Sequence, residues 1–179
     1  MDRRTQKTRK AIHEAFFTLL GQKNINKITV AEISQLANLG RGTFYLHYKD
    51  VYDLYEHIEN DFYSEIEQFF DQSYSSHDTA DLMYLTHTIT EFLSSNQKVF
   101  LLLSGSEASG RALSKLKDLF LKKIMWQESN QNLSDYYAVK YLFVVSGVVG
   151  VFEEWLLNRL ELSQKQISQT LYTILQKLE

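Results

Sequence analysis

The stretch that decides the fold of this 179-residue chain runs from residue 29 to residue 48 and reads TVAEISQLANLGRGTFYLHY. Thr29, with Glu32 three residues later, forms the capping-box pattern that begins a helix. We expect this helix to end near Asn38, because asparagine tolerates the left-handed backbone conformation common at helix ends. A second helix follows over residues 41–47 and is too short to be stable without packing. The stretch therefore predicts two short helices joined by a tight turn.

This pair has the form of a helix-turn-helix, in which the second helix enters the major groove of DNA with its first residues against base edges. Arg41 and Thr43 carry hydrogen-bond donors suited to base edges, and Gly42 leaves the backbone bare for a close approach. The polar side chains just beyond suit phosphate oxygens. The residues expected to contact DNA are Lys7, Lys10, Thr29, Arg41, Gly42, Thr43, Tyr45, His47, Tyr48 and Lys49.

Charge is distributed unevenly along the chain. Residues 1–50 hold nine Lys and Arg against four acidic residues, whereas the rest hold ten against eighteen. A helix is predicted over residues 5–22, and Lys7, Arg9 and Lys10 lie in its first turns, where the helix dipole favours acids. An external anion would relieve that placement. The pattern predicts a polyanionic partner for the N-terminal part only.

Composition excludes several classes of protein. The hydrophobic share of 44% and the charged share of 23% are typical of a globular chain. Cysteine is absent, so no disulfide, thiolate metal site or cysteine nucleophile is possible. No apolar signal segment follows Met1, and the most apolar stretch, residues 141–152, falls short of the ~20 residues that span a bilayer. We expect a cytoplasmic protein without a membrane partner.

The absence of proline and the presence of only seven glycines predict an all-α fold of long helices. Asp50 with Asp53 and Ser163 with Gln166 are capping-box pairs at two helix starts. Beyond the helix that follows Asp50, apolar periodicity predicts helices over residues 79–95, 98–103, 107–127, 134–158 and 164–178.

Residues 8–54 resemble the N-terminal domain of tetracycline-repressor-like (TetR family) transcription regulators. The stretch ITVAEISQLANLGRGTFYLHYKDVYDL, residues 28–54, carries the resemblance, with Asn38 where glycine is common and Gly40 where Ser or Thr commonly caps the second helix. The resemblance implies a homodimer of all-helical chains. It also implies a DNA-binding domain over residues 1–50 and a helical domain over residues 51–179 that dimerises and senses a small molecule.

A weaker resemblance concerns the penultimate helix, where Phe143, Gly147, Gly150 and Trp155 match one branch of the family, and Val139 replaces its tyrosine. Glycine inside a helix costs about 1 kcal/mol relative to alanine, which close approach of another helix or a ligand would offset. The alternative is packing within one chain. The residues expected at a dimer interface are Gly147, Gly150, Trp155, Ile167, Leu171, Ile174 and Leu178.

Large side chains in the second domain are candidates for a ligand pocket, since such pockets are mostly apolar with a few polar anchors. A plain hydrophobic core explains the same residues, and His87 fits either a ligand anchor or a hydrogen-bonded structural histidine. The candidate pocket residues are Phe62, Tyr63, Met83, His87, Phe100, Phe120, Trp126 and Phe143.

Catalytic and metal-binding patterns are missing. Asp53, His57 and Asp61 recur every four residues, but the outer two lie about 12 Å apart along a helix and cannot grip one ion. We therefore expect neither an enzyme nor a cofactor. The sequence predicts a ligand-responsive, homodimeric repressor of a palindromic operator. An activator, or a helical protein–protein adaptor that has lost DNA binding, is the alternative.

Overall fold

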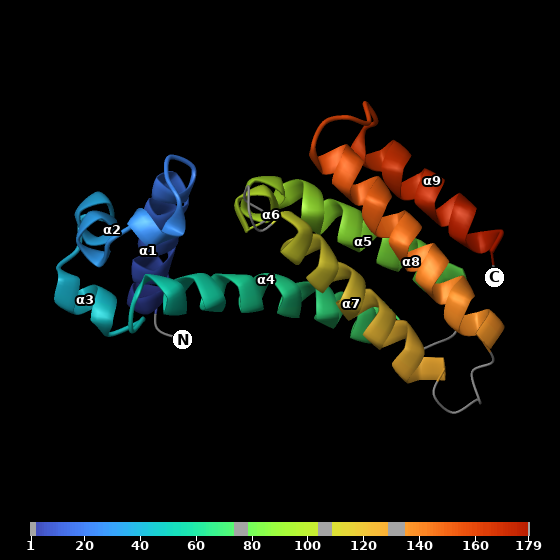
Figure 1. Cartoon of the computed structure of the whole chain (residues 1–179), viewed down its shortest axis with the longest axis horizontal. Helices are drawn as coiled ribbons and strands as arrows, with labels where there is room; N and C mark the ends of the chain where they lie inside the picture. Colours follow the sequence, from blue (N-terminus) through green and yellow to red (C-terminus); the bar gives the residue numbers. More distant parts are fainter. Residues whose placement is uncertain (1–2, 74–78, 104–108, 129–134, 179) are drawn as a thin grey trace. The chain divides into compact units, whose positions relative to one another are not determined.

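The computed structural model describes residues 3–73, 79–103, 109–128 and 135–178, and the regular elements in these ranges are all helices (Figure 1). They form two compact units, a head unit that ends at Phe62 and a body unit that begins at Tyr63. The boundary between the two units falls inside α4. The elements are α1 (Arg3–Leu20), the short 3₁₀ helix η1 (Ile25–Lys27), α2 (Val30–Leu36), α3 (Arg41–Tyr45), α4 (Val51–Ser73), α5 (Thr79–Ser95), α6 (Gln97–Leu103), α7 (Ser109–Glu128), α8 (Asp135–Leu156) and α9 (Gln164–Gln176).

Helix α2 begins and ends as its sequence predicts. The Thr29 hydroxyl oxygen accepts a hydrogen bond from the Glu32 amide at 3.3 Å, and the Glu32 carboxylate accepts one from the Thr29 amide at 3.0 Å. Lys23 lies 2.6 Å from the same carboxylate, and its hydrogen bond, followed by those from Thr29, lowers the pKa of Glu32. Asn38 has a φ of 54°, so the expected left-handed turn after α2 is confirmed.

Several described helix ends coincide with the predictions and the others differ by one or two residues, and the reason is local. α3 ends at Tyr45 and not at His47, because Leu46 caps it and the His47 amide donates to the Phe44 carbonyl across a tighter turn. η1 was not predicted; Asn24 caps it by accepting from the Asn26 amide. Such differences leave the order of helices unchanged.

The core of the head unit joins all four of its α-helical segments. Ile12 and Phe16 of α1, Ile33 of α2, Phe44 of α3 and Leu54 of α4 are each 0% exposed. Helix α3 has only five residues, so this shared burial, led by the Phe44 ring, is what holds it. Asp50 caps α4 by accepting hydrogen bonds from the Tyr52 and Asp53 amides, at 2.8 and 2.9 Å.

The body unit is a set of packed helix pairs. α5 lies along α9, α7 lies along α8, and α6 contacts both α5 and α7 (Figure 1). The predicted capping box at the start of α9 is confirmed, with Ser163 and Gln166 exchanging hydrogen bonds. The link between α8 and α9 is fixed by Asn158 at a φ of 56° and by the Trp155 indole, which donates to the Leu162 carbonyl at 2.8 Å.

Candidate nucleic-acid interface and ligand cavity

The start of α3 is open to solvent in the head unit. Arg41 and Gly42 are exposed, Thr43 is part-buried, and Tyr45 is 57% exposed, whereas Phe44 between them points into the core. A Cβ added at Gly42 would meet no described atom within 4 Å. The head therefore presents the first turn of α3 outward, with a bare backbone position beside two hydrogen-bonding side chains.

The other residues predicted to contact DNA differ in their exposure and in the interactions they already make within the head. Lys7, Lys10 and Lys49 are exposed, and Lys10 has only a surface ion pair with Glu14 at 3.9 Å. The Thr29 hydroxyl already donates to a carboxylate oxygen of its capping box at 2.8 Å. His47 is part-buried, and its ring lies beside that of the following tyrosine.

Tyr48 occupies a different place from the one expected for a phosphate contact. It is 2% exposed, and its hydroxyl accepts a hydrogen bond from Arg9 Nε at 3.0 Å and lies 2.8 Å from His13 Nε2. Burial, and then the Arg9 cation, lower the pKa of His13 to about 4, so its ring is neutral at pH 7. The Tyr48 hydroxyl and the neutral His13 ring therefore share a hydrogen bond at Nε2. Tyr48 is thus hydrogen-bonded inside the head.

This hydrogen-bonded chain joins α1 to the segment after α3, and an ion pair links it to α4. Arg9 belongs to α1, Tyr48 follows α3, and Asp61, 4.0 Å from the Arg9 guanidinium, belongs to α4. The Tyr48 hydrogen bond raises the pKa of Arg9, and burial raises that of Tyr48. His13 was not singled out from the sequence. Its spacing of four from Arg9, which places both on one helix face, is the signal that could have revealed it.

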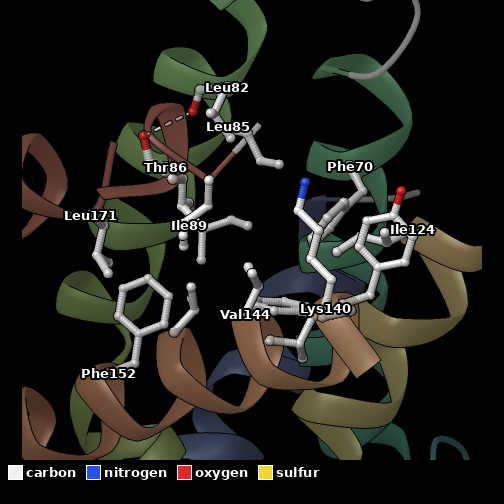
Figure 2. A pocket seen from close by; sticks show the side chains of 16 residues that line it. Phe70, Leu82, Leu85, Thr86, Ile89, Ile124, Lys140, Val144, Phe152 and Leu171 are labelled. Carbon is white, nitrogen blue, oxygen red and sulfur yellow. Dashed lines mark hydrogen bonds between the residues drawn. The ribbon is translucent and has the colours of Figure 1, made fainter. Parts of the chain in front are cut away.

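The body unit holds a cavity of about 150 Å³ between α5, α7, α8, α9 and the body part of α4 (Figure 2). Its lining is largely aliphatic and aromatic, with three polar exceptions: Thr86, Lys140 and Tyr141. In Figure 2 the Lys140 side chain extends from α8 toward Leu85 and Phe70. Lys140 is therefore the one charged group among the described lining residues.

Of the eight residues predicted for a pocket, Phe120 lines this cavity. Met83 and Phe143 are 51% and 71% exposed, and His87 is also exposed, with Glu91 at 3.8 Å from its ring. Tyr63 and Phe100 are buried away from the cavity, Phe62 belongs to the head unit, and the side chain of Trp126 lies outside the described part. Periodicity identified α5 as amphipathic but did not reveal that its Leu85 and Ile89 side faces the cavity.

Some of the residues predicted for a dimer interface are buried within the chain, and others are exposed or part-buried. Trp155, Ile167 and Leu171 are buried within the single chain, and Leu171 and Leu178 line the cavity. Ile174 is 47% exposed. Gly147 is exposed and Gly150 part-buried, and a Cβ at either would meet no described atom within 4 Å. The same side of α8 exposes Tyr136, Val139 and Phe143.

Within the described ranges, no group of three His, Asp or Glu side chains is placed to hold a metal ion. No helix there has the length and apolar character needed to cross a membrane.

A head with an outward helix-turn-helix and a helical body with a cavity define a class, the helix-turn-helix regulators. The TetR-type profile described as "Transcriptional regulator C-terminal region" matches residues 80–177. The chain belongs to the TetR family of transcriptional regulators.

Solved structures share the fold over nearly the whole chain. A transcriptional regulator from Aquifex aeolicus has 21% identity over 96% of this chain and 99% of that chain, with a TM-score of 0.68. SmeT, the repressor of the Stenotrophomonas maltophilia multidrug efflux pump SmeDEF, has 16% identity over 94% and 88%, with 0.65. DhaS, a dihydroxyacetone kinase operon activator, has 20% identity over 96% of both chains, with 0.59. No curated protein sequence matches the chain.

Proposed function

We propose that this regulator is a homodimeric repressor whose two heads bind a palindromic operator and whose body cavities hold a small-molecule effector. One observation carries the proposal. Gly42 in the head and Gly147 and Gly150 in the body all lie in helices, where glycine costs about 1 kcal/mol relative to alanine. None has a described neighbour within 4 Å of an added Cβ, so nothing in the described chain requires glycine there. Partners outside the chain account for these three positions.

At the head, the partner is duplex DNA. The bare backbone at Gly42 lets α3 approach the floor of the major groove, and the Arg41 guanidinium fits the two acceptors on a guanine edge. Lys7, Lys10 and Lys49 are exposed on the head and suit phosphates. Tyr48 positions α3 from inside the head and is not proposed as a DNA contact.

At the body, the partner is a second copy of the chain. Phe143 is 71% exposed on α8, an unusual position for phenylalanine, and it shares its side of the helix with Gly147 and Gly150. A second α8 can approach closely where side chains are missing, and Ile174 of α9 adds exposed apolar surface. Trp155, Ile167 and Leu171 are buried within the chain and are not proposed as interface contacts.

The cavity supplies the response to an effector. A ligand that fits the body better in one conformation than in another shifts the population toward that conformation, by no more than its differential affinity. If the favoured conformation holds the two heads at a spacing other than one helical turn of DNA, about 34–36 Å, the operator is released.

The DNA part is tested by selecting binding sites from random duplexes with the purified full chain. We expect a palindromic consensus. Arg41→Ala should relax discrimination at symmetric positions by about 1–3 kcal/mol. Replacing Lys7 and Lys10 together should leave the consensus unchanged but lower the slope of log K against log salt by about 0.9 for each lost phosphate contact. A purified, folded chain that selects no sequence would favour the protein–protein adaptor.

The dimer part is tested by sedimentation of Gly147→Leu, with Asp118→Leu on an exposed position of α7 as the matched control. The Cβ added at position 147 has no described neighbour within 4 Å in one chain, so the monomer should keep its helical circular dichroism. Across a two-fold axis the same change occurs twice and separates the helices. We expect the first variant to be a monomer with weak operator binding and the control to stay dimeric. A dimeric Gly147→Leu would place the interface elsewhere.

The sign of regulation is tested by a reporter gene under the selected operator. We propose repression because a head on the operator can block transcription without any further surface. Both a repressor and an activator share this fold, so the reporter decides. Higher expression on adding the chain would establish the activator instead.

A further inference from the structure

We infer that Leu46 is a base-reading residue, whose side chain contacts the C5-methyl group of a thymine in each half-site of the operator. The inference rests on the proposal that α3 enters the major groove of DNA, and it adds a residue that determines sequence preference. Its basis is the position of one apolar side chain on the outward face of the helix-turn-helix.

The backbone of α3 places Leu46 on the same face as Gly42. The Leu46 amide donates to the Gly42 carbonyl at 3.2 Å, so Leu46 follows Gly42 by one helical turn. At about 100° per residue, the two positions are about 40° apart around the helix axis, and Phe44 is about 160° from each. Because Phe44 is 0% exposed in the core of the head, the face that holds Gly42 and Leu46 points away from that core.

Leu46 is the most exposed large hydrophobic side chain in the described part of the chain, at 82%. A single exposed leucine is common on protein surfaces and needs no explanation by itself. This one, however, lies one turn from an exposed glycine, where an added Cβ would meet no described atom within 4 Å. Gly42 and Leu46 are therefore open to the same partner, and DNA that approaches the bare backbone also reaches the leucine.

The chemistry of leucine limits what it can contact on DNA. Its side chain has no hydrogen-bond donor or acceptor, so it cannot bind a phosphate oxygen or the polar groups of a base edge. In the major groove, the apolar group that a base edge presents is the C5-methyl of thymine, and apolar side chains commonly contact it. Leu46 is therefore suited to distinguish thymine from cytosine, which lacks this methyl group.

Tyr45 is the nearest alternative for the same role, because it is 57% exposed. Its ring lies edge-on to the Phe44 ring, with 5.7 Å between the centroids. Around the helix axis, Tyr45 is about 100° from Leu46, so the two side chains leave the helix in different directions. They would meet different parts of the groove, and variants of each separate their contributions.

The experiment measures binding of the full chain to the selected operator in which one symmetric pair of thymines at a time is replaced by uracil. This replacement removes two methyl groups and keeps every hydrogen-bonding group of the base edges. Burial of one methyl group corresponds to about four-fold in affinity, so uracil at the contacted pair should weaken binding about sixteen-fold over two half-sites. Fluorescence anisotropy at constant salt measures the affinities. Equal binding of all the uracil operators would overturn the inference.

Variants at Leu46 connect that loss to this side chain. Leu46→Ala should bind the thymine and uracil operators equally at the sensitive pair, whereas Leu46→Met keeps an apolar side chain and should retain most of the difference. Leu36→Ala, at a 51% exposed leucine where α2 ends, is the matched control and should respond like the parent. If Leu46→Ala stays as sensitive to uracil as the parent, or if only Tyr45→Ala removes the sensitivity, the inference is wrong.

Selection of binding sites distinguishes the failure of this inference from the failure of the proposed function. If the parent chain selects no sequence, both the operator-binding function and the reading of thymine by Leu46 are wrong. If the parent selects a palindrome and its response to uracil does not depend on Leu46, the proposed function stands and the inference alone is overturned.

Discussion

The head unit and the body unit stabilise their interiors in different ways. In the head, fully buried side chains such as Phe44 pack beside a hydrogen-bonded chain of Arg9, Tyr48 and His13, which joins α1 to the segment after α3. In the body, the interior is apolar around a cavity of about 150 Å³. A closely packed, hydrogen-bonded interior has one arrangement, and an interior with space can rearrange around a ligand. This difference agrees with the two proposed roles, DNA binding by a rigid head and a response to a bound effector in the body.

The largest expected effect is on the packing of the head. Phe44→Ala removes a ring that is 0% exposed, and we expect a loss of about 3–5 kcal/mol of head stability. Because α3 depends on this ring, operator binding should disappear while the body stays folded. Amide hydrogen exchange of the full chain, compared between α1 and α8, measures this separation. Equal loss of protection in α8 would mean that the two units unfold together.

A matched pair of enlargements compares the two interiors directly. Ala15→Val in the head adds bulk beside fully buried neighbours and should cost about 1–3 kcal/mol. Val145→Leu in the body adds bulk to a cavity wall, so it should be neutral or stabilising by about 0.5 kcal/mol, at roughly 24 cal/mol per Å³ of cavity filled. Hydrogen exchange at increasing denaturant concentration measures the free energy of unfolding of each unit separately. Similar costs at both sites would contradict the contrast between filled and hollow interiors.

The third prediction concerns the hydrogen-bonded chain of the head. Tyr48→Phe keeps the ring but leaves His13 Nε2 and Arg9 Nε without their partner, which should cost about 1–3 kcal/mol of head stability. Operator affinity should fall for all sequences alike, because the head that positions α3 is less stable. The same fall in affinity without any loss of head stability would restore Tyr48 as a phosphate contact.

The smallest effect is a dependence of head stability on pH. The pKa of His13 is about 4 in the folded head against 6.5 for the ordinary side chain, so the unfolded chain takes up a proton first as the pH falls. Head stability should therefore be complete above pH 6.5 and decrease as the pH falls toward 4. Hydrogen exchange in α1 at pH 7 and pH 5, for the parent and for His13→Gln, measures this. Equal changes in both would exclude His13 as the cause.

The sequence by itself determined the helices, their order and several of their ends. The sequence predicted the capping boxes at Thr29 and Ser163 and the left-handed turn at Asn38, and the structure contains them. It also predicted the helix-turn-helix to which Thr29 and Asn38 belong. These features depend on hydrogen bonds and backbone preferences within four residues along the chain, so neighbouring residue types are enough to specify them.

Only the tertiary structure decided which face of each helix turns inward. Periodicity could not tell that the Leu85 and Ile89 side of α5 lines the cavity while Met83 and His87 face outward. Nor could it tell that Tyr48 is hydrogen-bonded inside the head. One helical residue corresponds to a rotation of about 100°, and the choice between adjacent faces is made by partners distant in sequence. That choice placed Lys140, the one charged group in the described cavity lining, where local pattern had assigned no role.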